Sequence, residues 1–287
     1  MVEGTPVTVV TGASRGVGRG VAVALGAHGH TVYVTGRAEP PGGSTRPGTL
    51  QETADAVTAA GGRGVAVRVD HRDDDAVAAL FDRVRAEVGR LDVLVNNVAL
   101  VHDAVQAPGP FWEKPLWAGV DLLDVGVRSS YVSSYHAAPL LAATAGALVV
   151  FTSAPGAVHY QFDPAYGAHK AALDKFAADM AVDFAPVGVT SVSLWLGAVL
   201  TDRVQAIIDA GGEHAAFLTE VGETPEFAGH VIAALHADPA LRSRSGRTLI
   251  AAEVAREHGI TDRGGRRPPS FRDLMRVEPV QHRGRLQ

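Results

Sequence analysis

Cysteine does not occur in this chain of 287 residues. Its absence excludes disulfide bonds, thiolate metal sites and a cysteine nucleophile, and we expect a cytoplasmic location, where disulfides are rare. Long apolar runs are missing too, because the run at Gly146–Phe151 is far shorter than the roughly 20 residues that cross a bilayer. The residues before Pro6 include Glu3 and lack the basic and apolar signature of a signal peptide. We therefore expect no membrane association.

Positive charge is not in excess. The formal net charge is −5, so we expect no nucleic-acid partner. The twelve histidines follow no H-E-x-x-H or similar ligand spacing, so we expect no metal. Hydrophobic residues make up 46% of the chain and charged residues 20%, which is typical of a globular domain with a sizeable core.

Short apolar runs alternate along the chain with longer segments of helical spacing. Strands are predicted at Pro6–Val10, Thr31–Thr35, Gly64–Val69, Leu91–Val95, Ala147–Phe151, Val189–Leu194 and Thr248–Ile250. Helices are predicted at Val17–His28, Leu50–Ala60, Asp73–Val88, Leu116–Leu141 and Ala165–Phe184, and a helical pair before the last strand. This order predicts an α/β fold of Rossmann type, with a doubly wound parallel sheet in a three-layer α/β/α arrangement. We expect a single domain over residues 1–262 and a C-terminal tail over 263–287.

A glycine-rich segment, TGASRGVG at Thr11–Gly18, lies between the first predicted strand and the first predicted helix. Glycines let the backbone approach an anion closely, and the following helix presents unpaired N–H groups and the positive end of its dipole. In this context the segment predicts a dinucleotide-binding loop, with a plain strand–helix turn as the alternative. The expected cofactor contacts are Gly12, Ser14, Arg15, Gly16, Val17 and Gly18.

Two arginines bear on the choice of cofactor. The second strand is followed by Arg37, where an acidic residue would bond the 2′-hydroxyl of NAD, and Arg15 lies in the glycine loop. Two guanidinium groups can hold a 2′-phosphate with forked hydrogen bonds, so we expect NADP(H), with NAD(H) less favoured. Alternatively, both arginines are solvated surface residues, and the nearby Glu39 argues for NAD(H).

Polar residues also follow the third and fourth strands. Asp70 can accept a hydrogen bond from the adenine amino group or cap the helix that begins near Asp73. The Asn96-Asn97 pair can tie neighbouring strands together and line the cofactor cleft. We expect a structural role for Asn96 and cofactor contact for Asn97.

Tyr166 and Lys170 are four residues apart in a helical segment and so lie on one face. Ser153 follows the fifth strand, at the carboxyl end where ligands bind in open α/β sheets. A tyrosine can protonate the oxygen of a carbonyl that accepts hydride, an ammonium can lower the tyrosine pKa, and a serine can hold the same oxygen. An isolated Tyr/Lys pair is usually ordinary helix surface, but with Ser153 and the glycine loop it predicts the catalytic site of a carbonyl reductase or alcohol dehydrogenase.

These motifs resemble the short-chain dehydrogenase/reductase family in order and spacing. They are TGASRGVG at 11–18, Asn96-Asn97, Ser153, YGAHK at 166–170, and Gly197 with Thr201. The resemblance implies hydride transfer between NADP(H) and a ketone or secondary alcohol. It also implies that Thr201 contacts the nicotinamide carboxamide, and the cofactor set includes Tyr166 and Lys170.

Two residues depart from the family pattern. Leu196 stands where the family has a proline before Gly197. Asp124 stands where the family has an asparagine that completes a proton relay with the lysine, and an ionised carboxylate accepts hydrogen bonds but does not donate them. We include Asp124 among the catalytic residues.

Substrate shape should be set by three segments, Val98–Phe111, Ala154–Phe162 and Val199–Thr224. An aromatic-lined cleft suits a bulky hydrophobic carbonyl compound, although most of the side chains there can simply pack, Trp195 above all, and His159 suits a hydrogen-bonded structural role. The candidates are His102, Trp112, His159, Tyr160, Phe162, Trp195 and Phe217.

Three further interpretations follow from the sequence. The helices that carry Asp124 and Tyr166 are apolar on more than one face, as in family members that pair across a two-fold axis, so we expect a homodimer or homotetramer. A nucleotide-binding regulator with little catalysis is an alternative that Asp124 and Leu196 keep open. An NAD-dependent alcohol dehydrogenase is the other alternative.

Overall fold

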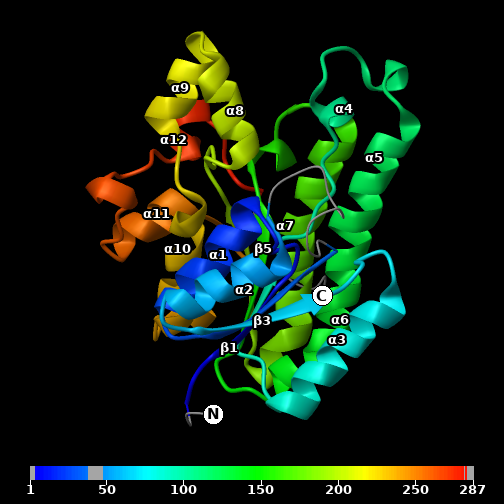
Figure 1. The fold of residues 1–287 in the computed structure, drawn as a ribbon, viewed down its shortest axis with the longest axis vertical. Coiled ribbons are helices and arrows are strands. Elements are labelled where there is room, and N and C mark those ends of the chain that lie inside the picture. Colours follow the sequence, from blue (N-terminus) through cyan, green and yellow to red (C-terminus); the bar gives the residue numbers. More distant parts are fainter. Residues whose placement is uncertain (1–3, 38–47, 281, 283–287) are drawn as a thin grey trace. The chain divides into compact units, whose positions relative to one another are not determined.

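The protein is described by a computed structural model that covers residues 4–37, 48–280 and 282 (Figure 1). Within those residues, seven strands form one parallel sheet in the order β3-β2-β1-β4-β5-β6-β7. The strands are β1 (Val7–Val10), β2 (Thr31–Gly36), β3 (Arg63–Arg68), β4 (Val93–Asn96), β5 (Leu148–Ser153), β6 (Thr190–Trp195) and β7 (Thr248–Ile250). All but the edge strand β3 are buried along their whole length, as expected where helices flank a parallel sheet.

The helices follow the strands in the predicted alternation. They are α1 (Gly16–Ala27), α2 (Leu50–Ala59), α3 (Asp74–Glu87), α4 (Asp103–Gln106), α5 (Leu116–Leu122), α6 (Ser129–Ala142), α7 (Pro164–Phe184), α8 (Asp202–Ala210), α9 (Glu213–Val221), α10 (Pro225–Ala237), α11 (Ala251–Glu257) and α12 (Phe271–Met275). The Rossmann-type fold class is confirmed. None of these helices is long and apolar enough to cross a membrane.

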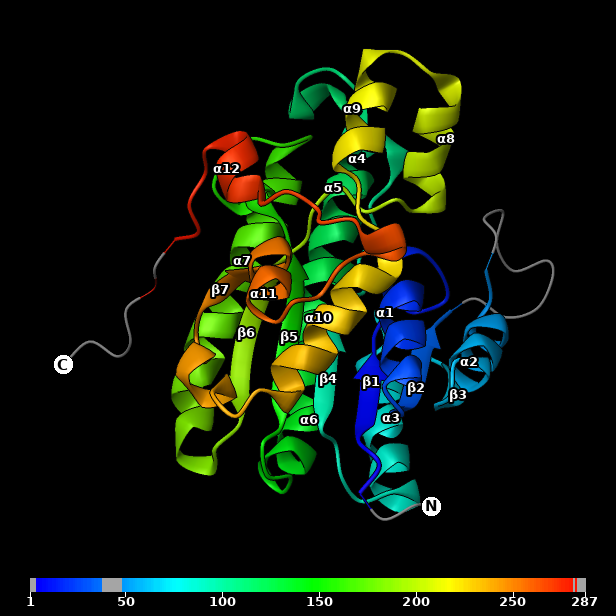
Figure 2. The ribbon, with the colours of Figure 1, turned by 90° about the vertical axis from the view of Figure 1, so that its left-hand side faces the viewer.

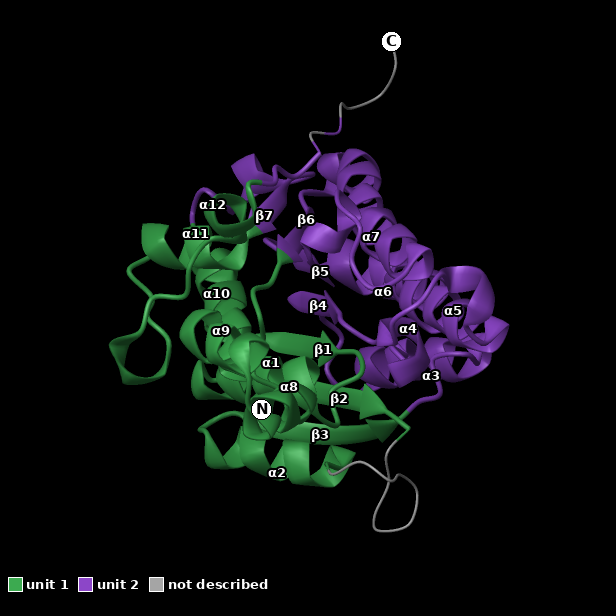
Figure 3. Ribbon diagram, turned by 90° about the horizontal axis from the view of Figure 1, so that it is seen from above, with its two compact units in different colours: residues 1–68, 195–238, 250–276 green, residues 69–194, 239–249, 277–287 purple. Residues whose placement is uncertain are grey.

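The chain separates into two compact units (Figure 3). Unit 1 takes in the described parts of residues 1–68, 195–238 and 250–276, and unit 2 those of residues 69–194, 239–249 and 277–287. Unit 1 contains β1 to β3, and unit 2 contains β4, β5 and most of β6 and β7. Because both units contribute strands to one sheet, the single domain over 1–262 stays a prediction.

In unit 1, α1 packs against α10 and α2 (Figure 2). Glycine allows the close approach of α1 and α10, since a Cβ atom at Gly20 would lie 2.2 Å from the Pro225 backbone carbon. The first part of the predicted tail also packs in this unit. The Arg266 guanidinium donates to the Gly222 carbonyl at 2.9 Å, and the Arg272 guanidinium donates to the Glu253 carboxylate at 2.9 Å.

In unit 2, α6 packs on β4 and α7 packs on β5 (Figure 2). The Asn96 side chain joins β4 to α6, because its Nδ2 donates to the Ser134 hydroxyl at 2.9 Å. This contact fits the structural role expected for Asn96.

The long central helix predicted at Leu116–Leu141 is interrupted. A π-helical turn, Leu123–Arg128, separates α5 from α6. The hydroxyls of Ser129 and Ser130 donate to carbonyls four residues earlier, at 2.5 and 2.7 Å, and such bonds loosen the regular ladder. The turn also packs closely on α7, since a Cβ atom at Gly126 would lie 2.7 Å from the His169 ring.

Candidate active site

The glycine-rich turn joins β1 to α1 within unit 1. Gly12 and Gly16 have φ values of +66° and +54°, a left-handed conformation that disfavours residues with a side chain. Helix α1 begins at Gly16, and the side chain of the preceding Arg15 does not cap its first turn. The free N–H groups of a first turn attract anions, so the turn fits the pyrophosphate of a dinucleotide.

Other predicted cofactor residues surround this turn. A Cβ atom at Gly16 would lie 3.5 Å from the Thr201 methyl group, so the structure brings these two residues together. The Thr201 hydroxyl also caps α8 by accepting from the Val204 amide at 3.4 Å. The Arg15 guanidinium donates to the Gly48 carbonyl at 3.2 Å. Ser14, Arg15 and Val17 are half-buried.

Arg37 is exposed directly after β2, where a side chain can reach a bound ribose. Glu39, which argues for NAD(H), lies outside the described residues. Asp70 is half-buried, and its carboxylate accepts from the Arg72 amide at 3.1 Å. The cap of α3 is Asp73, which accepts from two amides of the first turn, so the helix-cap alternative for Asp70 is wrong.

Ser153, Tyr166 and Lys170 lie together in unit 2. Ser153 is the last residue of β5, and its buried hydroxyl donates to the Lys170 carbonyl at 3.2 Å. The Lys170 ammonium donates to the Thr152 carbonyl at 3.1 Å and lies 5.6 Å from the centre of the Tyr166 ring. The Asn97 side chain accepts from the Thr152 hydroxyl at 3.4 Å and so lies near this cluster.

Burial dominates the protonation of the pair on α7. It raises the pKa of Tyr166 to about 12 and lowers the pKa of Lys170 to about 8, against a smaller opposing effect of the Asp174 carboxylate. The sequence interpretation expected the ammonium to lower the tyrosine pKa, and the structure shows the opposite direction. The reason is that burial removes the phenol from water and so disfavours the charged phenolate. At neutral pH, Tyr166 therefore holds its proton and can donate it.

Asp124 lies on the π-helical turn, where its carboxylate accepts from the Arg128 guanidinium at 2.6 Å. A second guanidinium, that of Arg72, lies 3.9 Å from it. Asp124 is thus engaged in partly exposed ion pairs with two arginines, and the relay expected for it stays a prediction.

The candidate substrate residues have different environments. Trp195 is fully buried in the core, as expected, whereas Trp112 and Tyr160 are about 70% exposed, at 72% and 69%. His102 is bonded to the Asp121 carboxylate at 2.8 Å. His159 differs from the hydrogen-bonded role expected for it, because its buried Nδ1 atom has no hydrogen-bond partner. Phe162 and Phe217 are partly exposed.

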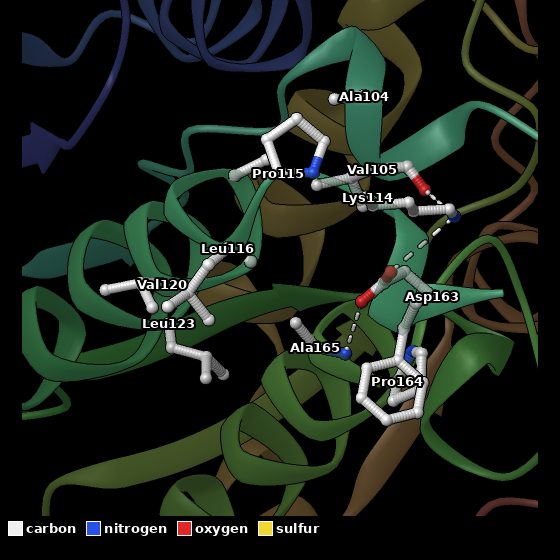
Figure 4. A pocket seen from close by; sticks show the side chains of 13 residues that line it. Ala104, Val105, Lys114, Pro115, Leu116, Val120, Leu123, Asp163, Pro164 and Ala165 are labelled. Atoms are coloured by element: carbon white, nitrogen blue, oxygen red, sulfur yellow. Dashed lines mark hydrogen bonds and ion pairs between the residues drawn. The ribbon is translucent and has the colours of Figure 1, made fainter.

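A pocket of about 170 Å³ opens in unit 2 beside the start of α7 (Figure 4). Its walls are mostly apolar side chains of α4, α5 and α7, and Lys114 and Asp163 form its polar side. Sequence reasoning missed both residues as site elements. Their signal is weak, since lysine occurs at just three positions, Lys114, Lys170 and Lys175, and nothing in the spacing joins Lys114 to Tyr166.

Comparison with known protein families identifies the family to which the chain belongs. Residues 6–211 match the short chain dehydrogenase family. The chain belongs to the short-chain dehydrogenase/reductase family. This family consists of oxidoreductases that act on small molecules with a nicotinamide cofactor.

The dehydrogenase/reductase resembles several known proteins. It is 38% identical to dehydrogenase/reductase SDR family member 1 of Mus musculus over 270 residues, which cover 91% of this chain and 84% of the relative. A short-chain dehydrogenase/reductase from Serratia marcescens matches with a TM-score of 0.71, 27% identity, and 85% and 95% coverage of the two chains. A short chain dehydrogenase from Burkholderia cenocepacia in complex with NADP matches with a TM-score of 0.70, 29% identity, and 85% and 94% coverage.

In this dehydrogenase/reductase, Leu196 replaces the family proline and is buried next to Gly197. Gly197 packs on a residue that sequence reasoning missed, since a Cβ atom there would lie 2.6 Å from a Glu223 carboxyl oxygen. No group of three or more His, Asp or Glu side chains placed to hold a metal occurs among residues 4–37, 48–280 and 282.

Proposed function

We propose that this oxidoreductase transfers hydride between NADP(H) and a ketone or secondary alcohol, with Tyr166 as the general acid and base. The observation that carries the proposal is the burial of the Tyr166 phenol, with the Lys170 ammonium 5.6 Å from its ring centre. The Ser153 hydroxyl is anchored on the Lys170 carbonyl, one helical turn from Tyr166.

The nicotinamide supplies or accepts the hydride when it is bound. In the reductive direction, negative charge develops on the carbonyl oxygen, and the Tyr166 hydroxyl donates its proton to that oxygen. The Ser153 hydroxyl turns from the Lys170 carbonyl to hold the same oxygen. In the oxidative direction, the Tyr166 phenol first passes its proton to the neutral amine of Lys170, and the resulting phenolate accepts the proton of the alcohol.

Lys170 would return a proton to the tyrosine after each turnover. Its pKa of about 8 lets it both hold and release a proton near neutral pH. Asp124 can take part through water if its carboxylate leaves the Arg128 guanidinium. Two more residues complete the proposed cofactor contacts. Asn97 contacts the cofactor, and Asp70 accepts a hydrogen bond from the adenine amino group.

NADP(H) is the proposed cofactor, bound by the glycine turn of unit 1 with Arg15 and Arg37 on the 2′-phosphate. The exposure of Arg37 after β2 and the NADP complex of the Burkholderia cenocepacia relative support this choice. The proposed substrate is a bulky hydrophobic carbonyl compound. Partly exposed aromatic rings beside the site, such as Tyr160 and Phe162, support it.

A homodimer or homotetramer is the proposed assembly. Large apolar side chains are exposed on α5 and α6, among them Leu116, Trp117, Val120, Tyr131 and Tyr135. Exposed large apolar side chains are typical of interaction sites where they gather into a patch. Sedimentation equilibrium of the intact chain tests the proposal, and a monomer mass at micromolar concentration would contradict it.

A nucleotide-binding regulator is the second candidate, and the pairing of Asp124 with Arg128 favours it because it occupies the expected relay residue. In that case, the protein binds NADPH and converts no carbonyl compound.

Replacing Tyr166 by phenylalanine decides between the two candidates. We expect Tyr166→Phe to lower ketone-dependent NADPH oxidation by at least about 100-fold, because it removes the proton donor. The dissociation constant of NADPH, measured by nucleotide fluorescence, should stay within about twofold. Tyr131→Phe is the matched control, since that tyrosine is half-exposed on α6, and it should keep full turnover. Full turnover in Tyr166→Phe would contradict the proposed mechanism, and no turnover by the parent protein across a broad panel of ketones would favour the regulator.

A further inference from the structure

Lys114 is an almost fully buried lysine just before α5, with a side chain 7% exposed. Its ammonium donates to the Val105 carbonyl and to the Phe162 carbonyl, both at 2.9 Å. The Asp163 carboxylate lies 3.6 Å away (Figure 4). The ammonium therefore makes two hydrogen bonds to backbone carbonyls and one ion pair with a carboxylate.

The Phe162 carbonyl that accepts from Lys114 belongs to a residue with an uncommon backbone conformation. Phe162 has a φ of +65°, in the left-handed region that residues with a side chain seldom adopt. Its carbonyl also accepts from the Tyr160 hydroxyl at 3.3 Å. Such a conformation persists where surrounding contacts hold it, and the Lys114 ammonium is the charged contact at this peptide.

Asp163 connects this peptide to the catalytic helix. Its carboxylate accepts from the Ala165 amide at 2.8 Å and caps α7. Its carbonyl accepts from the amides of Tyr166 and Gly167, at 3.0 and 3.1 Å. The Tyr166 backbone is therefore bonded directly to the residue that pairs with Lys114.

Phe162 also contacts the tyrosine side chain. The rings of Phe162 and Tyr166 pack edge to face, with centres 5.1 Å apart and planes at 77°. This geometry is the favoured one for two aromatic rings. Lys114 thus holds both the backbone and the ring neighbour of Tyr166, through Asp163 and Phe162.

We propose that Lys114 is a positioning residue for Tyr166, whose ammonium fastens the segment from Val105 to Lys114 onto the first turn of α7 and so fixes the phenol for proton transfer. The inference rests on the proposed function, because it assigns Lys114 a role in the reaction of Tyr166. General acid catalysis depends on geometry, and displacement by about 1 Å can cost about 100-fold in rate.

A charge-free side chain of similar length tests the role of the ammonium. In Lys114→Met, the Val105 and Phe162 carbonyls lose the ammonium as a donor, and the Asp163 carboxylate loses its ion-pair partner. We expect kcat for ketone reduction to fall between about 10-fold and 100-fold, while the dissociation constant of NADPH changes by less than about twofold. Amide hydrogen exchange over residues 159–168 should become faster. A uniform structural loss would instead weaken nucleotide binding as well.

Lys175→Met is the matched control, at a lysine on α7, the helix that carries Tyr166. Lys175 forms an exposed ion pair with Asp179, one turn away on α7, at 2.5 Å. It carries the same charge, and its loss should leave kcat and the exchange of residues 159–168 unchanged.

Asp163→Asn is a second test of the positioning role, for the case in which Lys114→Met does not fold. Asparagine can still cap α7 but carries no charge for Lys114. We expect kcat to fall by about threefold to 10-fold in this variant, with nucleotide binding kept. Wild-type kcat in Lys114→Met, or in Asp163→Asn if the first variant does not fold, would overturn the proposal.

The Tyr166→Phe background separates this inference from the proposed function. If Tyr166 is the acid and Lys114 acts through it, Lys114→Met causes no further loss of residual turnover in that background. A full additional loss there would overturn the positioning role alone. Wild-type turnover of Tyr166→Phe itself would instead overturn the proposed function.

Discussion

Glu223 lies between α9 and α10 and is almost completely buried, with 1% of its surface exposed. Neither carboxyl oxygen has a hydrogen-bond partner of good geometry. Burial raises the pKa of Glu223 to about 8, and the Asp262 carboxylate adds to this effect, while the Gly197 backbone opposes it. The folded protein therefore holds Glu223 in its neutral form at neutral pH.

This raised pKa makes stability depend on pH. Between about pH 4.5 and pH 8, the unfolded chain has lost the Glu223 proton and the folded protein has kept it. The free energy of unfolding therefore falls as pH rises through this window, by about 1.4 kcal/mol per pH unit from this group.

Glu223→Gln should remove that slope, because the amide resembles the neutral acid and does not ionise. We expect the variant and the parent to have similar stability near pH 4.5, and the variant to be more stable by about 2 kcal/mol or more at pH 8. Urea denaturation at both pH values measures this. Glu220→Gln, at an exposed position of α9, is the control. Parallel pH profiles for Glu223→Gln and the parent would show that Glu223 is ionised in the fold.

At the scale of the secondary-structure elements, helix α1 has two roles, one in cofactor binding and one in packing. Its first turn faces the proposed pyrophosphate, and its buried side packs against α10. Gly229 on α10 also lies close to α1, since a Cβ atom at Gly229 would lie 2.6 Å from the Ala24 methyl group. The packing of these helices thus depends on missing side chains at both contacts.

Gly20→Ala should destabilise unit 1 although alanine favours a helix. The added methyl group would meet the Pro225 backbone at 2.2 Å, which only a shift of α10 relieves. Overpacking costs about 1–3 kcal/mol, so we expect a loss of about 2 kcal/mol in the free energy of unfolding. Gly119→Ala on α5 is the control, where the methyl group would meet only the Ala165 side chain at 3.3 Å. Equal denaturation midpoints for the two variants would contradict the packing argument.

For the whole molecule, cofactor binding and stability are linked. A ligand that binds only the folded chain raises its free energy of unfolding, by about 2.7 kcal/mol at 100 times the dissociation constant. The proposed arginine contacts make this gain larger for NADPH than for NADH, because only NADPH carries the 2′-phosphate.

Thermal unfolding with each nucleotide checks the cofactor choice. We expect NADPH to raise the Tm more than NADH at equal concentration, and Arg37→Asp to reduce the NADPH effect while sparing that of NADH. Arg63→Asp is the control, since β2 and β3 are parallel and Arg63 lies beside Thr31, at the opposite strand end from Arg37. Equal shifts by both nucleotides in the parent protein would exclude a specific 2′-phosphate site.

Much of the fold follows from local patterns. The alternation of apolar runs and helical spacing predicted all seven strands within about three residues of their ends. The break in the central helix was not predicted, because helical spacing continues through Leu123–Arg128 and does not show which serine hydroxyls bond to backbone carbonyls. The first part of the predicted tail packs through Arg266 and Arg272, whose partners are far away in the sequence.

The candidate site likewise has features that the sequence predicted and features that it missed. The spacing of Tyr166 and Lys170 and the position of Ser153 after β5 predicted their grouping, since helix periodicity and strand ends determine it. The direction of the tyrosine pKa was missed, because it depends on burial. Glu223 was missed for the same reason, and Lys114 because its carbonyl partners carry no side-chain signal.

The sequence by itself determined the family, the glycine turn and the Ser–Tyr–Lys set, because those depend on residue type at short or regular spacing. Only the tertiary structure decided how strongly each ionisable group is buried and which distant carbonyls Lys114 holds. Solvent exclusion and long-range contacts arise when elements pack, and no short stretch of sequence records them.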